Sequence, residues 1–217
     1  MPQTPPHTSA ATAPATPVET PGSAGPALAT PRQRELFDAL LTTFLQEGFA
    51  HFTMDQAAAR FHCSKSTMYA LGRTADDVLR RVLVSFFREV ARRTDLALTS
   101  QRSAARALQA YFEAMGAALE PASATFMRDV ATHPATRGIY DTNTHHATQK
   151  IRQLIERGVA DREFRDVPLD FIAQLIELAM EQIQQGRLQG AHPARAYTEL
   201  GQVILFGLGA DKPGSQG

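Results

Sequence analysis

The feature that most constrains the fold is an apolar period of three to four residues that continues from Pro31 to about Leu208. This spacing is the period of an amphipathic helix. Pro168 and Pro193 lie, like Pro31, where a new helix is expected to begin, and a missing N–H costs nothing there. No segment shows alternating β-branched residues between turn signals. The sequence therefore predicts an all-α chain of about nine helices.

The first 30 residues differ in composition from the rest of the chain. Eight of the 13 prolines lie in residues 1–31, among Thr, Ala and Ser, and this stretch contains no Lys or Arg. Such a segment cannot offset its ordering entropy by burying apolar surface. We therefore expect a disordered Pro/Thr/Ala-rich arm at 1–30, a first domain at 31–74, a second domain at 75–209 and a flexible tail at 210–217.

Composition excludes several classes of protein. Cys63 is the single cysteine, so neither an internal disulfide nor a thiolate zinc site is expected. No apolar run approaches the ~18 residues needed to cross a bilayer, and residues 1–31 contain no signal-peptide core. We therefore expect a cytoplasmic protein with no membrane partner. The 22 Lys and Arg balance 22 Asp and Glu, which excludes a generally basic nucleic-acid coat protein but permits a local basic surface.

Motifs for catalysis and metal binding are absent from the sequence. It contains no Gly-rich phosphate loop, nucleophile elbow or paired-carboxylate motif. His145 and His146 are adjacent, so on a helix their side chains project about 100° apart. No His or Glu four residues away completes a metal site with them. We therefore expect no enzyme activity, no metal and no cofactor.

Two short helices with a tight turn between them are predicted in residues 53–71. Thr53 followed by Gln56 is a capping box that begins the first helix, and Ser64 is placed to cap the second. This is the helix-turn-helix arrangement, whose second helix enters the major groove of DNA and presents its N-terminal residues to base edges. The segment is therefore a candidate DNA-reading unit.

The second of these helices begins with side chains suited to DNA. Lys65 can donate to guanine O6 and N7 or to a phosphate, while the short hydroxyls of Ser66 and Thr67 let the backbone approach closely. Tyr69 is a candidate phosphate donor. Residues 31–93 hold ten Lys and Arg against seven acids, a small positive excess that suits a dimer pooling two weakly positive domains.

The order T-M-D-Q-A-A-A-R-F-H-C-S-K-S-T-M-Y, followed by a D-D-V-L helix start, resembles the DNA-binding domain of TetR-family transcriptional regulators. The resemblance covers about Pro31 to Leu79. It implies an N-terminal helix-turn-helix domain followed by a helical ligand-binding and dimerisation domain. It also implies phosphate contacts at Thr53, Thr67 and Tyr69 and base or groove contacts at Lys65 and Ser66. With Ser64, the predicted cap of the second helix, and Arg73, the candidate DNA-binding residues number seven.

The sequence departs from the family pattern near this unit. His62 stands where the family usually has the turn glycine, and Leu71-Gly72 stands where an aromatic pair usually packs. Ala75 replaces a lysine that usually reaches phosphate. Arg73, two positions earlier, is placed to supply the missing cation.

The helix expected from about Ala135 to Gly158 carries polar residues on its apolar stripe. Asn143 interrupts that stripe and His146 flanks it. Polar groups in such positions need a partner. In one interpretation each is hydrogen-bonded within the bundle or exposed, and in the other they line an apolar pocket with a few orienting polar groups. The candidate lining residues are Phe112, Met115, Phe126, Tyr140, Asn143, His146 and Leu175.

The helices that begin at Pro168 and Pro193 are apolar on more than one face. A helix of this kind is buried on two sides. We expect the second side to meet the same surface of another copy, forming an isologous four-helix dimer interface. The alternative is that both helices form the central core of one chain.

Together these features predict a homodimeric regulator, most simply a repressor, that binds a palindromic double-stranded DNA operator. A small hydrophobic ligand is expected to release it by favouring a DNA-incompetent spacing of the two reading heads. The alternative is an all-α ligand-binding or protein-interaction module whose helix-turn-helix no longer binds DNA.

Overall fold

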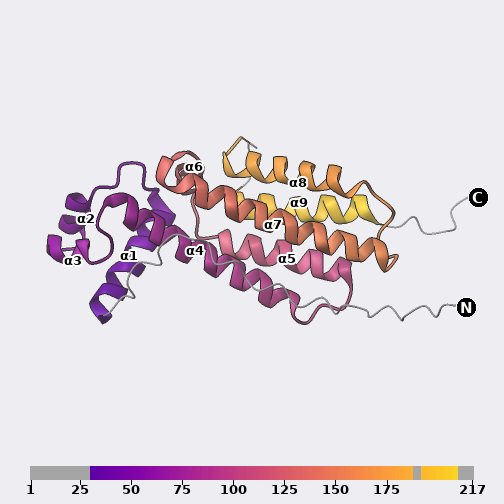
Figure 1. Cartoon of the computed structure of the whole chain (residues 1–217), viewed down its shortest axis with the longest axis horizontal. Helices are drawn as coiled ribbons and strands as arrows, with labels where there is room; N and C mark the ends of the chain where they lie inside the picture. Colours follow the sequence, from indigo (N-terminus) through magenta and orange to yellow (C-terminus); the bar gives the residue numbers. More distant parts are fainter. Residues whose placement is uncertain (1–29, 188–191, 210–217) are drawn as a thin grey trace, which may run out of the picture.

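The computed structural model describes residues 30–187 and 192–209, and within them it confirms the all-α prediction (Figure 1). The predicted arm, apart from Thr30, and the predicted tail lie outside the described residues. Nine helices form the described part: α1 Pro31–Glu47, α2 Met54–Arg60, α3 Lys65–Tyr69, α4 Ala75–Leu98, α5 Ala104–Leu119, α6 Ala124–Thr132, α7 Pro134–Ala160, α8 Leu169–Gln184 and α9 Pro193–Leu208. None of these helices is long and apolar enough to span a membrane.

The first helix shows how local sequence signals set the element boundaries. Thr30 caps α1 and forms a capping box with Gln33, while Pro31 occupies the first turn. The helix ends at Gly48, whose φ of +83° is in the left-handed region that favours glycine. The helix begins at Pro31, as the sequence predicted.

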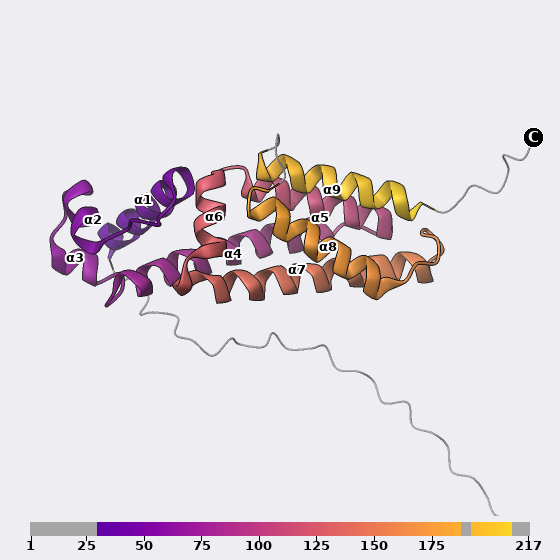
Figure 2. The same ribbon diagram turned by 90° about the horizontal axis from the view of Figure 1, so that it is seen from above.

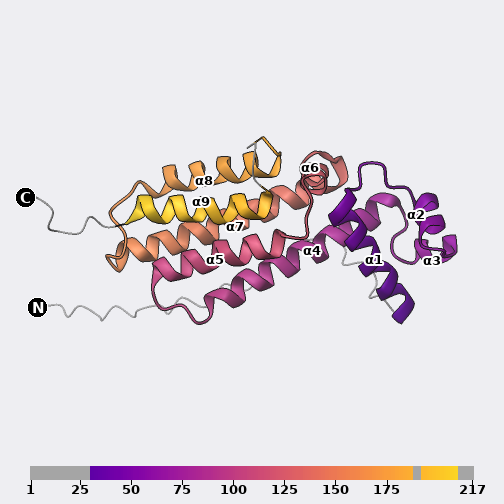
Figure 3. The same ribbon diagram turned by 180° about the vertical axis from the view of Figure 1, so that it is seen from behind.

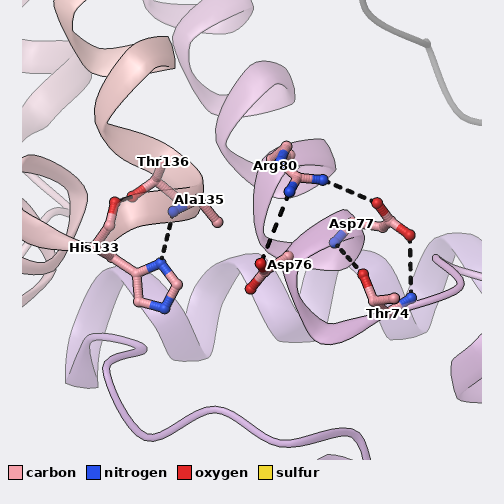
Figure 4. A network of polar contacts seen from close by, with 7 residues as sticks. All are labelled: Thr74, Asp76, Asp77, Arg80, His133, Ala135 and Thr136. Carbon is pink, nitrogen blue, oxygen red and sulfur yellow. Dashed lines mark hydrogen bonds and ion pairs between the residues drawn. The ribbon is translucent and has the colours of Figure 1, made fainter.

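Helix α4 is long and joins the two parts of the molecule. Its N-terminal end packs beneath the head formed by α1, α2 and α3, and its C-terminal end runs along the bundle (Figure 1). Thr74 caps it, because its hydroxyl accepts from the Asp77 N–H at 3.1 Å while the Asp77 carboxylate accepts from the Thr74 N–H (Figure 4). Val78 and Val82 are fully buried on the side facing the core.

The second part is a bundle in which α5, α7, α8 and α9 lie side by side (Figures 1 and 3). Helices α5 and α9 approach closely at Gly201, where an added Cβ would lie 2.6 Å from Phe112 Cβ. Phe112 and Tyr197 are buried at this contact. Helix α6 stands across the end of the bundle, between it and α1 (Figure 2).

The buried face of α7 differs from the predicted stripe. Tyr140 is buried as expected, but the buried positions that follow it are Thr144 and Thr148, whereas Asn143 is only half-buried. Within a helix a threonine hydroxyl can bond to a carbonyl of the preceding turn, as Thr148 Oγ1 does to the Thr144 carbonyl at 3.0 Å, so its methyl group can pack inward.

Candidate nucleic-acid interface

Both helices of the predicted helix-turn-helix begin at a capped residue. The Thr53 hydroxyl accepts from the Gln56 N–H at 3.3 Å, and the Ser64 hydroxyl accepts from the Thr67 N–H at 3.1 Å. His62, in the turn between α2 and α3, has a φ of +47°, so the position that usually carries glycine does adopt a left-handed conformation. The two short helices and the tight turn between them are as predicted.

One buried side chain anchors α3 to the head. Met68 is fully buried, and Leu71 follows it as a second buried residue just beyond the helix. The helix is shorter than predicted, since it ends at Tyr69 and not at Leu71. Lys65, Ser66 and Tyr69 are exposed, with Tyr69 showing 49% of its surface. Three of the seven residues predicted to meet DNA are therefore exposed on α3.

Hydroxyl groups at the start of α3 bond to one another. Ser64 Oγ lies 2.8 Å from Ser66 Oγ and 2.8 Å from Thr67 Oγ1. Thr67 is half-buried, whereas Thr53 is exposed at the start of α2. Ser64 thus has a structural role as the cap of α3, in addition to its place beside the exposed residues.

Charges around α3 are partly paired. Lys65 Nζ lies 2.9 Å from Asp55 Oδ1 on α2, and the hydrogen bond with that carboxylate raises the pKa of the lysine. Arg73 is exposed, and no partner for it is found within the described residues. The first turn of α4 carries Asp76 and Asp77, which lie 3.8 and 3.0 Å from Arg80 (Figure 4). The positive charge on this face is therefore small.

The departure at Leu71-Gly72 has a packing explanation. A Cβ on Gly72 would lie 2.8 Å from the Val78 backbone nitrogen, so the loop after α3 passes directly against α4. Arg81 Nη1 on α4 donates to the Leu71 carbonyl at 3.0 Å. A buried leucine and a close backbone approach thus hold α3 on α4, at the positions where the family usually has an aromatic pair.

Comparison with known proteins identifies the fold. No protein-family profile and no curated protein matches the chain by sequence. Solved structures do match it in shape. A TetR-family regulatory protein from Rhodococcus RHA1 aligns with a TM-score of 0.64 at 16% identity, over 84% of this chain and 100% of the other. The chain has the TetR-family fold.

Two further solved structures have the same arrangement. A putative transcriptional regulator from Saccharomonospora viridis in complex with choline aligns with a TM-score of 0.64 at 15% identity, over 83% of this chain and 98% of the other. The TetR-family regulator PfmR from Thermus thermophilus aligns with a TM-score of 0.62 at 15% identity, over 82% and 99%. The similarity thus extends over nearly the whole length of each of these solved structures.

Within this TetR-family fold, the seven residues predicted to line a ligand pocket do not all come together. Four are buried in the core: Phe112, Met115, Phe126 and Tyr140. His146 is exposed, and Leu175 shows 53% of its surface, so neither lines a buried pocket. Asn143 is half-buried and donates to the Ile139 carbonyl of its own helix at 2.7 Å. This agrees with the interpretation that its side chain is hydrogen-bonded within the bundle and does not line a pocket.

The TetR-family fold brings α6 against the head through a contact that sequence reasoning missed. The Asp129 carboxylate on α6 accepts from the backbone N–H groups of Phe49 at 2.6 Å and Ala50 at 2.9 Å, in the loop between α1 and α2. Asp129 is 8% exposed. A Cβ on Gly48 would lie 2.5 Å from Asp129 Oδ2, so glycine is needed there for space as well as for its φ.

A cleft of about 540 Å³ lies beside this contact, lined by α1, α2 and α6. Its wall includes Phe44 and Phe49, whose rings lie 5.6 Å apart, and Phe49 in turn packs edge-on against Phe126 of α6 at 5.8 Å. The available signal in the sequence was an acid, Asp129, between the apolar residues of a short helix. Nothing local indicates its partner, which lies 80 residues away.

Proposed function

We propose that the chain is a DNA-binding transcriptional regulator, a repressor that leaves its operator when a ligand binds in the bundle. The observation that carries the proposal is the exposed face of α3. Lys65 and Ser66 stand at its N-terminal end, where a recognition helix presents side chains to base edges, and Tyr69 follows as a phosphate donor. The proposed role is regulatory and not catalytic, and the proposed location is the cytoplasm.

Selection of bound sequences from random duplex DNA tests the proposal. We expect a palindromic sequence to be enriched at about 0.15 M salt and bound at least about a thousand-fold more tightly than non-specific DNA. Lys65→Ala should weaken binding to that sequence about ten-fold and relax its preference at one base pair in each half-site. Lys150→Ala is the matched control, because Lys150 pairs with Asp95 on the bundle, far along the chain from α3. Failure to enrich any sequence would contradict the proposal.

A homodimer through α8 and α9 is part of the proposed function. Five large apolar side chains on these two helices are more than half exposed: Phe171, Leu175, Leu178, Val203 and Phe206. Large apolar side chains exposed together on two neighbouring helices support an interaction site there. An isologous pairing of α8 and α9 would join two heads, which must reach major grooves about 34 Å apart.

The proposed signal runs from the bundle to the head through α6. Asp129 holds the loop that joins α1 to α2, so a displacement of α6 shifts the head relative to α4. A ligand acts by preferring the arrangement in which the two heads are wrongly spaced. A neighbour with the same fold, the putative transcriptional regulator from Saccharomonospora viridis, was solved in complex with choline, which supports the proposal that this chain also binds a small molecule.

A second candidate function is a ligand-binding or protein-interaction module without DNA binding. The observation that favours it is the acidic surrounding of α3, where Asp55 pairs with Lys65 and Asp76 and Asp77 follow Ala75. The dependence of DNA affinity on salt distinguishes the two functions. A regulator loses affinity steeply as salt rises, because phosphate contacts release counterions, whereas a module without a DNA site shows no measurable binding at any salt concentration.

A further inference from the structure

The cleft between the head and α6 is large enough to hold a small molecule. Its volume of about 540 Å³ lies within the range of ligand-binding clefts, ~300–1,000 Å³. Residues of α1, α2, the loop between them and α6 line it. Helix α6 stands between α1 and the bundle (Figure 2). A molecule in this cleft would therefore contact the head and α6 at the same time.

Four phenylalanines supply the apolar lining of the cleft. The ring centroid of Phe44 lies 5.6 Å from that of Phe49 and 5.0 Å from that of Phe52, and Phe61 lines the cleft from the end of α2. Phe44 and Phe49 are buried, whereas Phe52 and Phe61 are half-buried and keep part of their surface available. Covering this surface would favour an occupant with an apolar body.

The titratable side chains that line the cleft are Glu47, His51, Arg60, Arg128 and Asp129. Both acids are already engaged. Two guanidinium nitrogens of Arg60 donate to the two carboxylate oxygens of Glu47, at 2.6 and 2.5 Å. Asp129 is 8% exposed and accepts from two backbone N–H groups of the α1–α2 loop. A cationic occupant would have to compete with these donors for either carboxylate.

Arg128 has a charge that is not engaged in this way. It is exposed on α6, and within residues 30–187 and 192–209 its guanidinium has no hydrogen-bond or ion-pair partner. The planar guanidinium group presents paired N–H donors that match the two oxygens of a carboxylate. An acid held by Arg128 would place the rest of its molecule in the cleft beside the phenylalanines.

We propose that this cleft binds a small organic monocarboxylate, whose carboxylate pairs with Arg128 and whose apolar body covers Phe52 and Phe61. The site is separate from the ligand site proposed in the bundle, and binding there does not depend on DNA. The occupant contacts α1, α2 and α6 together, so it stabilises the contact of Asp129 with the α1–α2 loop. The cleft is thus a second regulatory input that fixes the head against α6.

Four probes test the chemistry of the site: 2-naphthoate, 2-naphthamide, 2-naphthylmethylammonium and acetate. Isothermal titration calorimetry of the full chain without DNA measures each Kd. We expect 2-naphthoate to bind at least about ten-fold more tightly than 2-naphthamide, because an ionised acceptor forms stronger hydrogen bonds with a guanidinium group. The ammonium probe and acetate should show no measurable binding, since the first lacks the acid and the second lacks the apolar body.

Three results with the probes would overturn the proposal. Equal affinities for 2-naphthoate and 2-naphthamide would show that the charge is not recognised. Tighter binding of the ammonium probe would show that the cleft selects cations. No binding of 2-naphthoate at millimolar concentration would show that the cleft holds no such acid.

Variants of the lining test the two contacts separately. Arg128→Ala should lower the affinity for 2-naphthoate to that for 2-naphthamide and leave 2-naphthamide unchanged. Arg106→Ala is the matched control, because Arg106 is an exposed arginine on α5 that does not line the cleft. Thr43, a half-buried lining residue of α1, allows the cleft to be filled, and Thr43→Trp should weaken both naphthalene probes at least about ten-fold. An Arg128→Ala protein that still prefers the acid would contradict the assignment.

Hydrogen exchange locates the site without any substitution. The amides of Phe49 and Ala50 donate to Asp129 beside the cleft. At about ten times its Kd, 2-naphthoate should slow their exchange about ten-fold, because the loop opens only when the acid has left. Slower exchange confined to α8 and α9 would place the acid in the bundle and refute the inference. No measurement here contains DNA, so failure of this inference is distinguishable from failure of the proposed DNA binding.

Discussion

The head and the bundle differ in how their polar side chains are hydrogen-bonded and in which side chains they expose. In the head, Thr53 and Ser64 cap their helices with bonds that span three residues, and the exposed side chains are polar. In the bundle, the hydroxyls of Tyr140 and Tyr197 are buried and have no hydrogen-bond partner among the described residues, while Phe206 shows 93% of its surface. The polar groups of the head are thus paired locally or exposed to solvent. The bundle instead buries polar groups and exposes apolar ones, a difference that agrees with the ligand binding and dimerisation proposed for it.

The largest expected effect separates the stability of the head from that of the bundle. Met68→Ala empties the fully buried anchor of α3 and should lower the free energy of unfolding of the head by about 2–5 kcal/mol. Hydrogen exchange should show faster exchange in α2 and α3 and unchanged protection in α7 and α9. DNA binding should be lost while the dimer remains. An equal loss of hydrogen-exchange protection in the head and in the bundle would contradict the expectation that the two parts are stabilised separately.

The next effect concerns the exposed apolar surface of the bundle. Leu178→Glu places a charge on α8 where 57% of the leucine is exposed, and it should raise the dimer dissociation constant at least 100-fold, about 2.7 kcal/mol. Analytical ultracentrifugation measures this constant. Leu96→Glu is the control, because Leu96 on α4 is similarly exposed at 61% and lies outside α8 and α9. If both variants remain equally dimeric, the interface lies elsewhere.

The link between the two parts gives a smaller effect. Asp129→Ala removes the acceptor of two backbone hydrogen bonds and should lower the free energy of unfolding by about 2 kcal/mol. Asp129→Asn should lose less, because its amide oxygen still accepts. Both are measured by denaturant unfolding, with Asp141→Ala as an exposed control on α7. Operator affinity of Asp129→Ala should respond less to a ligand. A fully responsive variant would show that the signal does not pass through Asp129.

The smallest effect is on the DNA-facing surface. Tyr69→Phe should weaken binding by about 1 kcal/mol, roughly five-fold, and equally for selected and non-specific DNA, because a phenol on phosphate reads no base. Fluorescence anisotropy with both DNAs measures the two affinities. The free energy of unfolding of Tyr69→Phe should equal that of the wild type, since Tyr69 is half exposed. A change in preference at one base pair would assign Tyr69 to base reading.

Local features of the helix starts were predicted from the sequence, whereas the packing of the bundle and its contact with the head were not. The caps at Thr30, Thr53 and Ser64 were predictable because cap and partner lie within four residues. The buried face of α7 was not, since threonine can turn inward only if its hydroxyl finds a carbonyl. The hydrogen bond of Asp129 to the α1–α2 loop could not be predicted either, because it depends on where the fold places α6.

The predicted ligand site failed for a related physical reason. Apolar periodicity identifies which helices contribute to a core, and Phe112, Phe126 and Tyr140 are indeed buried. It does not identify which side of each helix faces which neighbour, so Leu175 was assigned inward although the fold exposes it. The buried Gln184 was missed because polar residues are expected at the surface.

The anchoring of α3 by the buried Met68 and Leu71 has a consequence for how such a protein diversifies. Lys65, Ser66 and Tyr69 are exposed and are not part of this buried anchor. If α3 reads DNA as proposed, replacing these side chains would change which DNA is recognised while leaving the buried anchor and the bundle in place. The proposed choice of operator would then be separable from the proposed ligand response, and a duplicated copy would need only a few surface substitutions to acquire a new operator.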